Sequence, residues 1–128
     1  MCQSPCPFCH LLPERILQIN ETGVLVRDGF PVSLGHSLVI PRRHVSSFFD
    51  LVENERAELF ALLDEGKRDL DALYAPAGYN IGVNDGKSAG QTVPHLHIHL
   101  IPRYEGDSVD PRGGVCWVIP SKAVYWDY

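Results

Sequence analysis

The sequence of 128 residues lacks several features that mark large classes of protein. No apolar run approaches the roughly 20 residues that a membrane-spanning helix needs, so we expect no membrane partner. The first residues show neither the basic nor the apolar region of a signal peptide, which favours a cytoplasmic protein. Internal repeats, low-complexity stretches and linkers are also missing. One domain over 1–128 is therefore expected.

Basic residues are scarce as well. Lysine and arginine together number 11 against 16 acidic residues, and the net charge is −5. A protein that binds duplex nucleic acid usually has a basic face, so nucleic acid is not an expected partner. A small anionic ligand is still compatible with this composition, because a local site can be positive on an acidic protein.

The cysteines suggest a metal site but do not complete one. In a cytoplasmic chain, cysteines are more often thiols or metal ligands than disulfides. The segment Cys6-Pro7-Phe8-Cys9 provides one half of a zinc site. The sequence has no second Cys-x-x-Cys, so histidines would have to supply the other ligands. A redox pair and two unlinked thiols are the alternatives.

Apolar spacing predicts an α+β fold, with an antiparallel β-sheet of about five strands and one long α-helix packed across it. Leucines at helical spacing, with charged residues between them, predict the helix over about 50–74. Asp50 and Glu53 are candidates for its capping box. Short β-rich stretches predict strands over 17–20, 22–28, 36–41, 79–84 and 95–101, after a helical turn over 13–16.

Three histidines, His95, His97 and His99, alternate with apolar residues. A strand would place these imidazoles on one face and the apolar residues on the other, toward a core. The glycine-rich segment 85–90 precedes them, with Asn84 at its edge. Such a row of imidazoles is suited to binding either a metal ion or a phosphate group. Neutral imidazole can also act as a nucleophile at phosphorus when an acceptor holds its other ring nitrogen.

The segment His95-Leu96-His97-Ile98-His99-Leu100-Ile101 resembles the signature of the histidine triad family of nucleotide hydrolases and transferases. The residues before it, 90–93, are similar to the fragile-histidine-triad branch, and 35–44 and 84–86 resemble the family's upstream and phosphate-loop segments. The resemblance covers nearly all of 6–103. It implies an antiparallel sheet with one long helix, usually in a homodimer.

The resemblance also implies a reaction, the cleavage of dinucleoside polyphosphates to mononucleotides. His97, the middle histidine, would attack the α-phosphorus and form a nucleotidyl-histidine that water then hydrolyses. His99 would contact phosphate oxygens, and His36 would buttress the histidines. The implied substrate-binding residues are Asn84, Gln91 and Thr92 for the phosphates and leaving group, Asp28 for the ribose, and Phe8, Val26 and Leu38 for the base.

Zinc is a further implication. In several bacterial relatives and in the related galactose-1-phosphate uridylyltransferases, an N-terminal Cys-x-x-Cys, an upstream histidine and the first triad histidine hold zinc. Cys6, Cys9, His44 and His95 occupy these places here. Two cysteines with two histidines make a closed, structural site. We therefore expect one structural zinc ion and no organic cofactor.

Two other functions stay open at this point. The chain can be a nucleoside phosphoramidase or a nucleotidyltransferase, which differ from the hydrolase in leaving group or acceptor. It can also be a zinc-stabilised nucleotide-binding protein with little activity, although a pure binder has no need of a nucleophile. The aromatic tail over 125–128 packs either on its own domain or on a second subunit.

Overall fold

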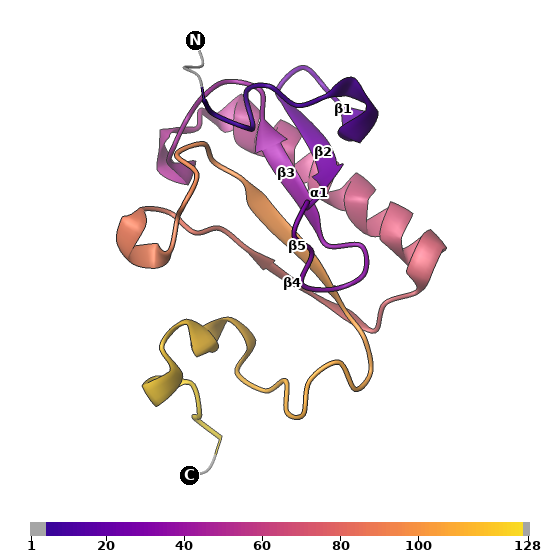
Figure 1. Ribbon diagram of the computed structural model, residues 1–128, viewed down its shortest axis with the longest axis vertical. Coiled ribbons are helices and arrows are strands. Elements are labelled where there is room, and N and C mark those ends of the chain that lie inside the picture. The colour runs from indigo at the N-terminus through magenta and orange to yellow at the C-terminus, as the bar shows by residue number, and fades with distance from the viewer. Residues whose placement is uncertain (1–4, 127–128) are drawn as a thin grey trace.

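The computed structural model describes residues 5–126, and it has the predicted α+β architecture (Figure 1). Five strands form one antiparallel sheet in the order β1-β2-β3-β5-β4. The strands are β1 (Ile16–Ile19), β2 (Gly23–Arg27), β3 (Ser37–Pro41), β4 (Gly78–Gly82) and β5 (Ile98–Arg103), and the α-helix is α1 (Glu53–Tyr74). Short 3-10 turns are η1 (Pro13–Arg15), η2 (Phe48–Asp50), η3 (Lys87–Ala89), η4 (Gly114–Val118) and η5 (Pro120–Lys122).

Helix α1 covers one face of the sheet and contacts β2, β3 and β5 (Figure 1). Leu25, Val39 and Ile98 from these strands form a buried cluster with Leu59 and Leu62 of the helix. These leucines are part of the periodic pattern that predicts the helix. Burial of such side chains contributes about 1.5–3 kcal/mol each, so this cluster fixes the helix on the sheet.

The opposite face of the sheet is covered differently. There, a buried cluster on β2 and β3 packs against the N-terminal segment, through the residues Val24, Val26, Leu38 and Ile40 on the sheet and Phe8, Leu11 and Ile16 over them. His99 of β5 pairs with Leu38 in the register of the sheet. Because neighbouring residues of a strand point to opposite faces, the imidazole of His99 lies on the face away from the helix.

The predicted start of the helix and its capping box were wrong. Residues near Asp50 belong to the separate turn η2, and α1 begins at Glu53. Asp85 accepts a hydrogen bond from the Phe48 N–H at 2.9 Å and so holds η2 apart from the helix. The cap of α1 is instead made by Glu55, whose carboxylate accepts from the Val52 N–H at 3.0 Å.

The predicted strand over 95–101 was also wrong at its start. β5 begins at Ile98, so of the three histidines only His99 lies in the strand. Pairing with β3 ends at Ile98, and the last residue of β3, Pro41, has no amide hydrogen to extend a ladder. The Leu96 N–H donates instead to the Val45 carbonyl at 2.7 Å.

The alternation of buried residues survives this change. Leu96, Ile98 and Leu100 are all at most 2% exposed, as the sequence predicts for residues that point into the core. The remaining strands are confirmed, with ends shifted by at most two residues. β4 ends at Gly82, which leaves Asn84 in the loop that follows the strand.

The segment after β5 runs along the edge strand of the sheet. The turn η4 contacts β4, and Gly114 lies close to Asn80 of that strand. The rings of Tyr125 and Trp126 contact each other at 5.2 Å between centroids, and the last two residues of the predicted aromatic tail lie outside the described range. Within 5–126, no helix has the length and apolar character required to cross a membrane.

Gly23 of β2 tests the packing of the helix on the sheet. A Cβ atom there would lie 2.5 Å from Leu59 Cδ2 and 3.0 Å from the Ile40 carbonyl oxygen. We expect Gly23→Ala to lower the free energy of unfolding by about 1–3 kcal/mol, because the added methyl group has no room. The matched control is Gly78→Ala on β4, where a Cβ meets nothing within 4 Å. Urea denaturation of both variants measures the difference, and equal stabilities would contradict this packing.

Candidate functional site

A cavity of about 460 Å³ opens on the face of the sheet away from α1. His97, His99 and His36 form part of its wall, and Asn84 and Thr92 line it from the loop side. A larger hollow of about 750 Å³ lies between the C-terminal segment and the sheet, but it has no histidine in its lining. The smaller cavity is therefore the candidate site for chemistry at phosphorus.

His97 is held in one tautomer. Its Nδ1 lies 2.9 Å from the His95 carbonyl oxygen. A carbonyl oxygen can only accept, so the Nδ1 atom of the neutral ring must carry the hydrogen. The Nε2 atom of His97 then has a free lone pair at the wall of the cavity. This is the arrangement that a nucleophilic imidazole requires.

His36 and His99 form a chain of hydrogen bonds with defined direction. The backbone N–H of Val32 donates to His36 Nδ1 at 3.1 Å, so this nitrogen carries no hydrogen. His36 Nε2 therefore holds the hydrogen of the neutral ring and donates it to His99 Nδ1 at 2.9 Å. The hydrogen of His99 is left on Nε2, which makes this atom a donor.

Burial keeps these imidazoles neutral. Desolvation is the largest cause that lowers the pKa of His99 to about 4, and the neighbouring His97 and His36 contribute to the same shift. Burial also lowers the pKa of His36, against the opposing charge of Asp28. The Asp28 carboxylate lies 3.4 Å from His36 Nε2 and accepts a hydrogen bond from the Phe30 N–H at 2.8 Å.

Gln91 holds a loop together instead of lining the cavity. Its Oε1 accepts from the Gly86 N–H at 2.8 Å, and its Nε2 donates to the carbonyls of Ser46 at 3.0 Å and Val93 at 3.1 Å. These bonds use the polar atoms of the amide. They fix the glycine-rich segment 86–90, which leads to Thr92.

Three residues were expected to contact the nucleotide base, and two of them line the cavity. Phe8 and Leu38 do so, whereas Val26 is fully buried in the cluster below it. The cavity also contains Phe30 and Arg15, which the sequence prediction missed. Phe30 follows Asp28 by two residues, and this closeness was the one available signal. Nothing in the sequence singles out Arg15.

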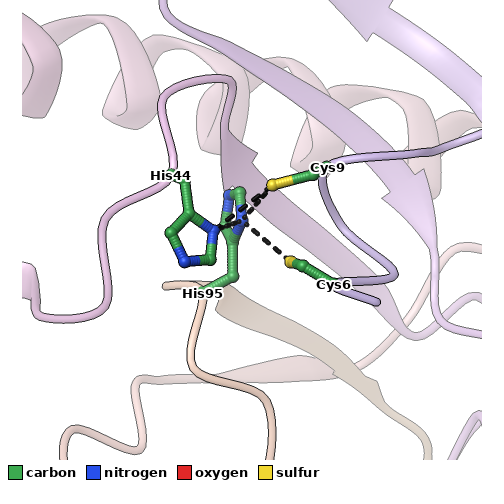
Figure 2. A group of neighbouring side chains, drawn as sticks. All are labelled: Cys6, Cys9, His44 and His95. Carbon is green, nitrogen blue, oxygen red and sulfur yellow. Dashed lines mark hydrogen bonds between the residues drawn. The ribbon is translucent and has the colours of Figure 1, made fainter. Parts of the chain in front are cut away.

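The four predicted metal ligands come together at one end of the sheet. Figure 2 shows Cys6, Cys9, His44 and His95 with their sulfur and nitrogen atoms directed toward one another, and these ligand atoms all lie within 4.8 Å of each other. Cys6 Sγ lies 3.4 Å from His95 Nδ1, Cys9 Sγ lies 3.3 Å from His44 Nδ1, and the two Nδ1 atoms are 3.1 Å apart.

These separations fit a tetrahedral zinc ion. Bond lengths of about 2.3 Å to sulfur and about 2.0–2.1 Å to nitrogen give tetrahedral edges of about 3.5 Å between S and N and about 3.3 Å between two N atoms. His95 also has the expected outer partner, because its Nε2–H donates to the Pro41 carbonyl at 2.8 Å and leaves Nδ1 bare for a metal. Cys6 is a free thiol, whereas Cys9 is disulfide-bonded in this structure, so zinc binding requires Cys9 in its reduced form.

Comparison with known proteins gives a family match. Residues 11–106 match the family model described as HIT domain. A bis(5'-nucleosyl)-tetraphosphatase (asymmetrical) from Schizosaccharomyces pombe is 42% identical over 77 residues, which cover 60% of this chain and 42% of that protein. An AP-4-A phosphorylase from Mycobacterium tuberculosis is 41% identical over 99 residues, which cover 70% of this chain and 51% of that protein.

A solved structure is similar as well. The crystal structure of a Zn-bound histidine triad family protein from Mycobacterium smegmatis superposes with a TM-score of 0.67 at 33% identity, over 74% of this chain and 69% of that one. The match to the two enzymes covers only about half of their length or less.

The lowered pKa of His99 predicts a dependence of stability on pH. An imidazole in the unfolded chain titrates near 6.5, whereas His99 in the folded protein titrates near 4. The unfolded state therefore binds more protons between these values, and stability falls as the pH is lowered from about 7 to 4. We expect His99→Gln to reduce this slope by at most about 1.4 kcal/mol per pH unit, the effect of one proton. Urea denaturation at several pH values and equal zinc content measures it, and unchanged slopes would contradict the burial effect.

Proposed function

This chain belongs to the HIT family, and we propose that it is a nucleotide hydrolase that cleaves dinucleoside polyphosphates at the α-phosphate through a nucleotidyl-His97 intermediate. The relatives named as a tetraphosphatase and a phosphorylase support a nucleotide-processing enzyme. The observation that carries the proposal is the bond between His97 Nδ1 and the His95 carbonyl, because it leaves Nε2 free to attack at the cavity.

In the first step, the Nε2 lone pair of His97 forms a bond to the α-phosphorus. The bond from phosphorus to the bridging oxygen breaks, and its electron pair leaves with the departing nucleotide. The ring becomes cationic, and the His95 carbonyl that accepts from Nδ1 stabilises this charge. In the second step, water attacks phosphorus and the P–N bond returns its electron pair to Nε2. A proton from the water passes to solvent, and a mononucleotide is released.

The neighbouring residues would orient and stabilise the phosphate. His99 would donate from Nε2 to a non-bridging oxygen, and its low pKa makes it a neutral donor at pH 7. His36 would fix that donor through its bond to His99. Asn84 and Thr92 line the same cavity and would bind phosphate oxygens. We assign Gln91 an indirect role, through the loop that it holds.

The remaining residues would select the nucleoside. The Asp28 carboxylate lines the cavity and would accept hydrogen bonds from ribose hydroxyls. Phe8 and Leu38 would contact the base on its apolar side, with Val26 supporting them from below. A cavity of about 460 Å³ lies in the range of roughly 300–1,000 Å³ that is typical for small ligands.

We also propose that Cys6, Cys9, His44 and His95 hold a structural zinc ion. The tetrahedral separations support this, and the M. smegmatis relative is described as Zn-bound. With four protein ligands the ion has no open position, so it supplies a cross-link between the N-terminal segment and the sheet and takes no part in bond cleavage. No organic cofactor is proposed.

A transferase is the second candidate. The AP-4-A phosphorylase relative favours it, because inorganic phosphate can take the place of water in the second step. A phosphoramidase would use the same intermediate with an amine as the leaving group. The single domain over 1–128, the homodimer and the cytoplasmic location stay predictions.

The proposal predicts products that distinguish these candidates. Diadenosine tetraphosphate should give AMP and ATP by hydrolysis, and ADP in place of AMP when inorganic phosphate is the acceptor. We expect His97→Ala to lower kcat by at least about 10³-fold, because the nucleophile is lost. The control is His10→Ala, since His10 is exposed and does not line the cavity. Chromatography of the products measures both variants, and equal turnover by wild type and His97→Ala would disprove the mechanism.

A further inference from the structure

The turn Cys6-Pro7-Phe8-Cys9 belongs to two sites at once. Its outer residues, Cys6 and Cys9, supply the sulfur atoms of the metal cluster. Its inner residues, Pro7 and Phe8, line the nucleotide cavity. A metal ion that fixes the two ends of this turn therefore also fixes part of the cavity wall.

Phe8 lies between a metal ligand and the proposed nucleophile. Its ring meets the edge of His97 at 5.0 Å between centroids and that of His95 at 6.0 Å, both in T-shaped geometry. Below, Phe8 packs against the buried cluster of β2 and β3. Such aromatic contacts contribute about 0.5–1.5 kcal/mol each beyond area burial, so the position of Phe8 affects the placement of the His97 ring.

The turn is also held by a backbone hydrogen bond and by contacts of its sulfur atoms. Within the described chain, its own backbone contributes a hydrogen bond from the Cys9 N–H to the Cys6 carbonyl at 3.3 Å. The sulfur contacts to the two histidines are 3.3–3.5 Å long. Zinc–thiolate bonds would be much stronger than these sulfur–nitrogen contacts, so a bound metal would hold Pro7 and Phe8 more firmly.

We propose that zinc binding and nucleotide binding are coupled in this protein, and that Phe8 is the positioning residue that carries the coupling. Zinc holds the turn so that Phe8 closes the cavity beside His97, and a nucleotide that packs on Phe8 holds the turn for zinc. The identity of the ligand rests on the proposed function. The coupling is reciprocal, because each ligand must change the affinity of the other by the same factor.

The test uses the full chain in a non-thiol reductant, with Zn²⁺ and AMP as the two ligands. AMP has no anhydride bond, so its binding does not depend on catalysis. Calorimetry should show one zinc per chain and a Kd for AMP about tenfold weaker in zinc-free protein, within the usual range of coupling between two sites. Competition with a chelator should show zinc bound about tenfold more tightly in saturating AMP.

Two variants identify the residue that carries the coupling. Phe8→Ala should still bind one zinc. Its coupling factor, the ratio of the Kd for AMP without zinc to the Kd with zinc, should fall close to one. Phe30→Ala is the matched control, since Phe30 lines the same cavity, is 91% exposed and does not lie on the turn. Phe30→Ala should weaken AMP binding equally with and without zinc, so its coupling factor should equal that of the wild-type protein. If the zinc-free protein unfolds, the coupling is measured on zinc-bound protein instead. The rate at which a chelator removes zinc is then compared with and without AMP.

The possible outcomes separate this inference from the proposed function. Equal AMP affinity with and without zinc would overturn the coupling and leave cleavage by His97 standing. A full coupling factor in Phe8→Ala would overturn the role of Phe8. A coupled protein that turns over no dinucleotide would support the coupling and contradict the hydrolase. Failure to bind AMP in either state would overturn the coupling, and turnover of the dinucleotide would still decide the hydrolase.

Discussion

The hydrogen bond from His97 Nδ1 to the His95 carbonyl is the interaction on which the proposed chemistry depends. It fixes the tautomer that leaves His97 Nε2 bare. The same residue, His95, directs its ring into the metal cluster and anchors it through the Pro41 carbonyl. His95 thus uses its carbonyl for His97 and its ring for the metal cluster. Both contacts require that the chain around His95 lie outside the regular hydrogen-bond ladder of the sheet. The late start of β5 at Ile98 allows it.

The arrangement of the fold gives these groups a face of their own. Helix α1 covers one side of the sheet, so the imidazoles on the other side meet a cavity and the N-terminal segment. Partial burial there lowers the pKa of His36 and His99. Each neutral ring has one donor and one acceptor nitrogen, so the hydrogen bonds run in one direction, from the Val32 N–H to His36 and from His36 to His99. Burial on this face thus determines which atoms donate to a phosphate.

The sequence predicts the parts of this structure that depend on local spacing. The long helix, the alternating burial around the histidines and the four residues of the metal cluster follow from periodicity and from family resemblance. Features that depend on contacts between distant segments were missed. The start of β5 depends on where β3 ends, the cap of α1 depends on Glu55 in place of Asp50, and the hydrogen bonds of Gln91 depend on the carbonyl of the distant Ser46. The hydrogen bond from the Val32 N–H to His36 comes from a backbone group, so no residue type in the sequence indicates it.

The central claim is that His97 forms a covalent bond to the nucleotide while His95 serves the metal cluster. Rapid quenching of wild-type protein during turnover of diadenosine tetraphosphate, followed by peptide mass spectrometry, tests it most directly. We predict a mass increase of one adenylyl group on His97, formed and lost at rates fast enough to account for turnover. An adduct on His95 or His99, or full turnover with no adduct on any histidine, would contradict the division of roles between these residues.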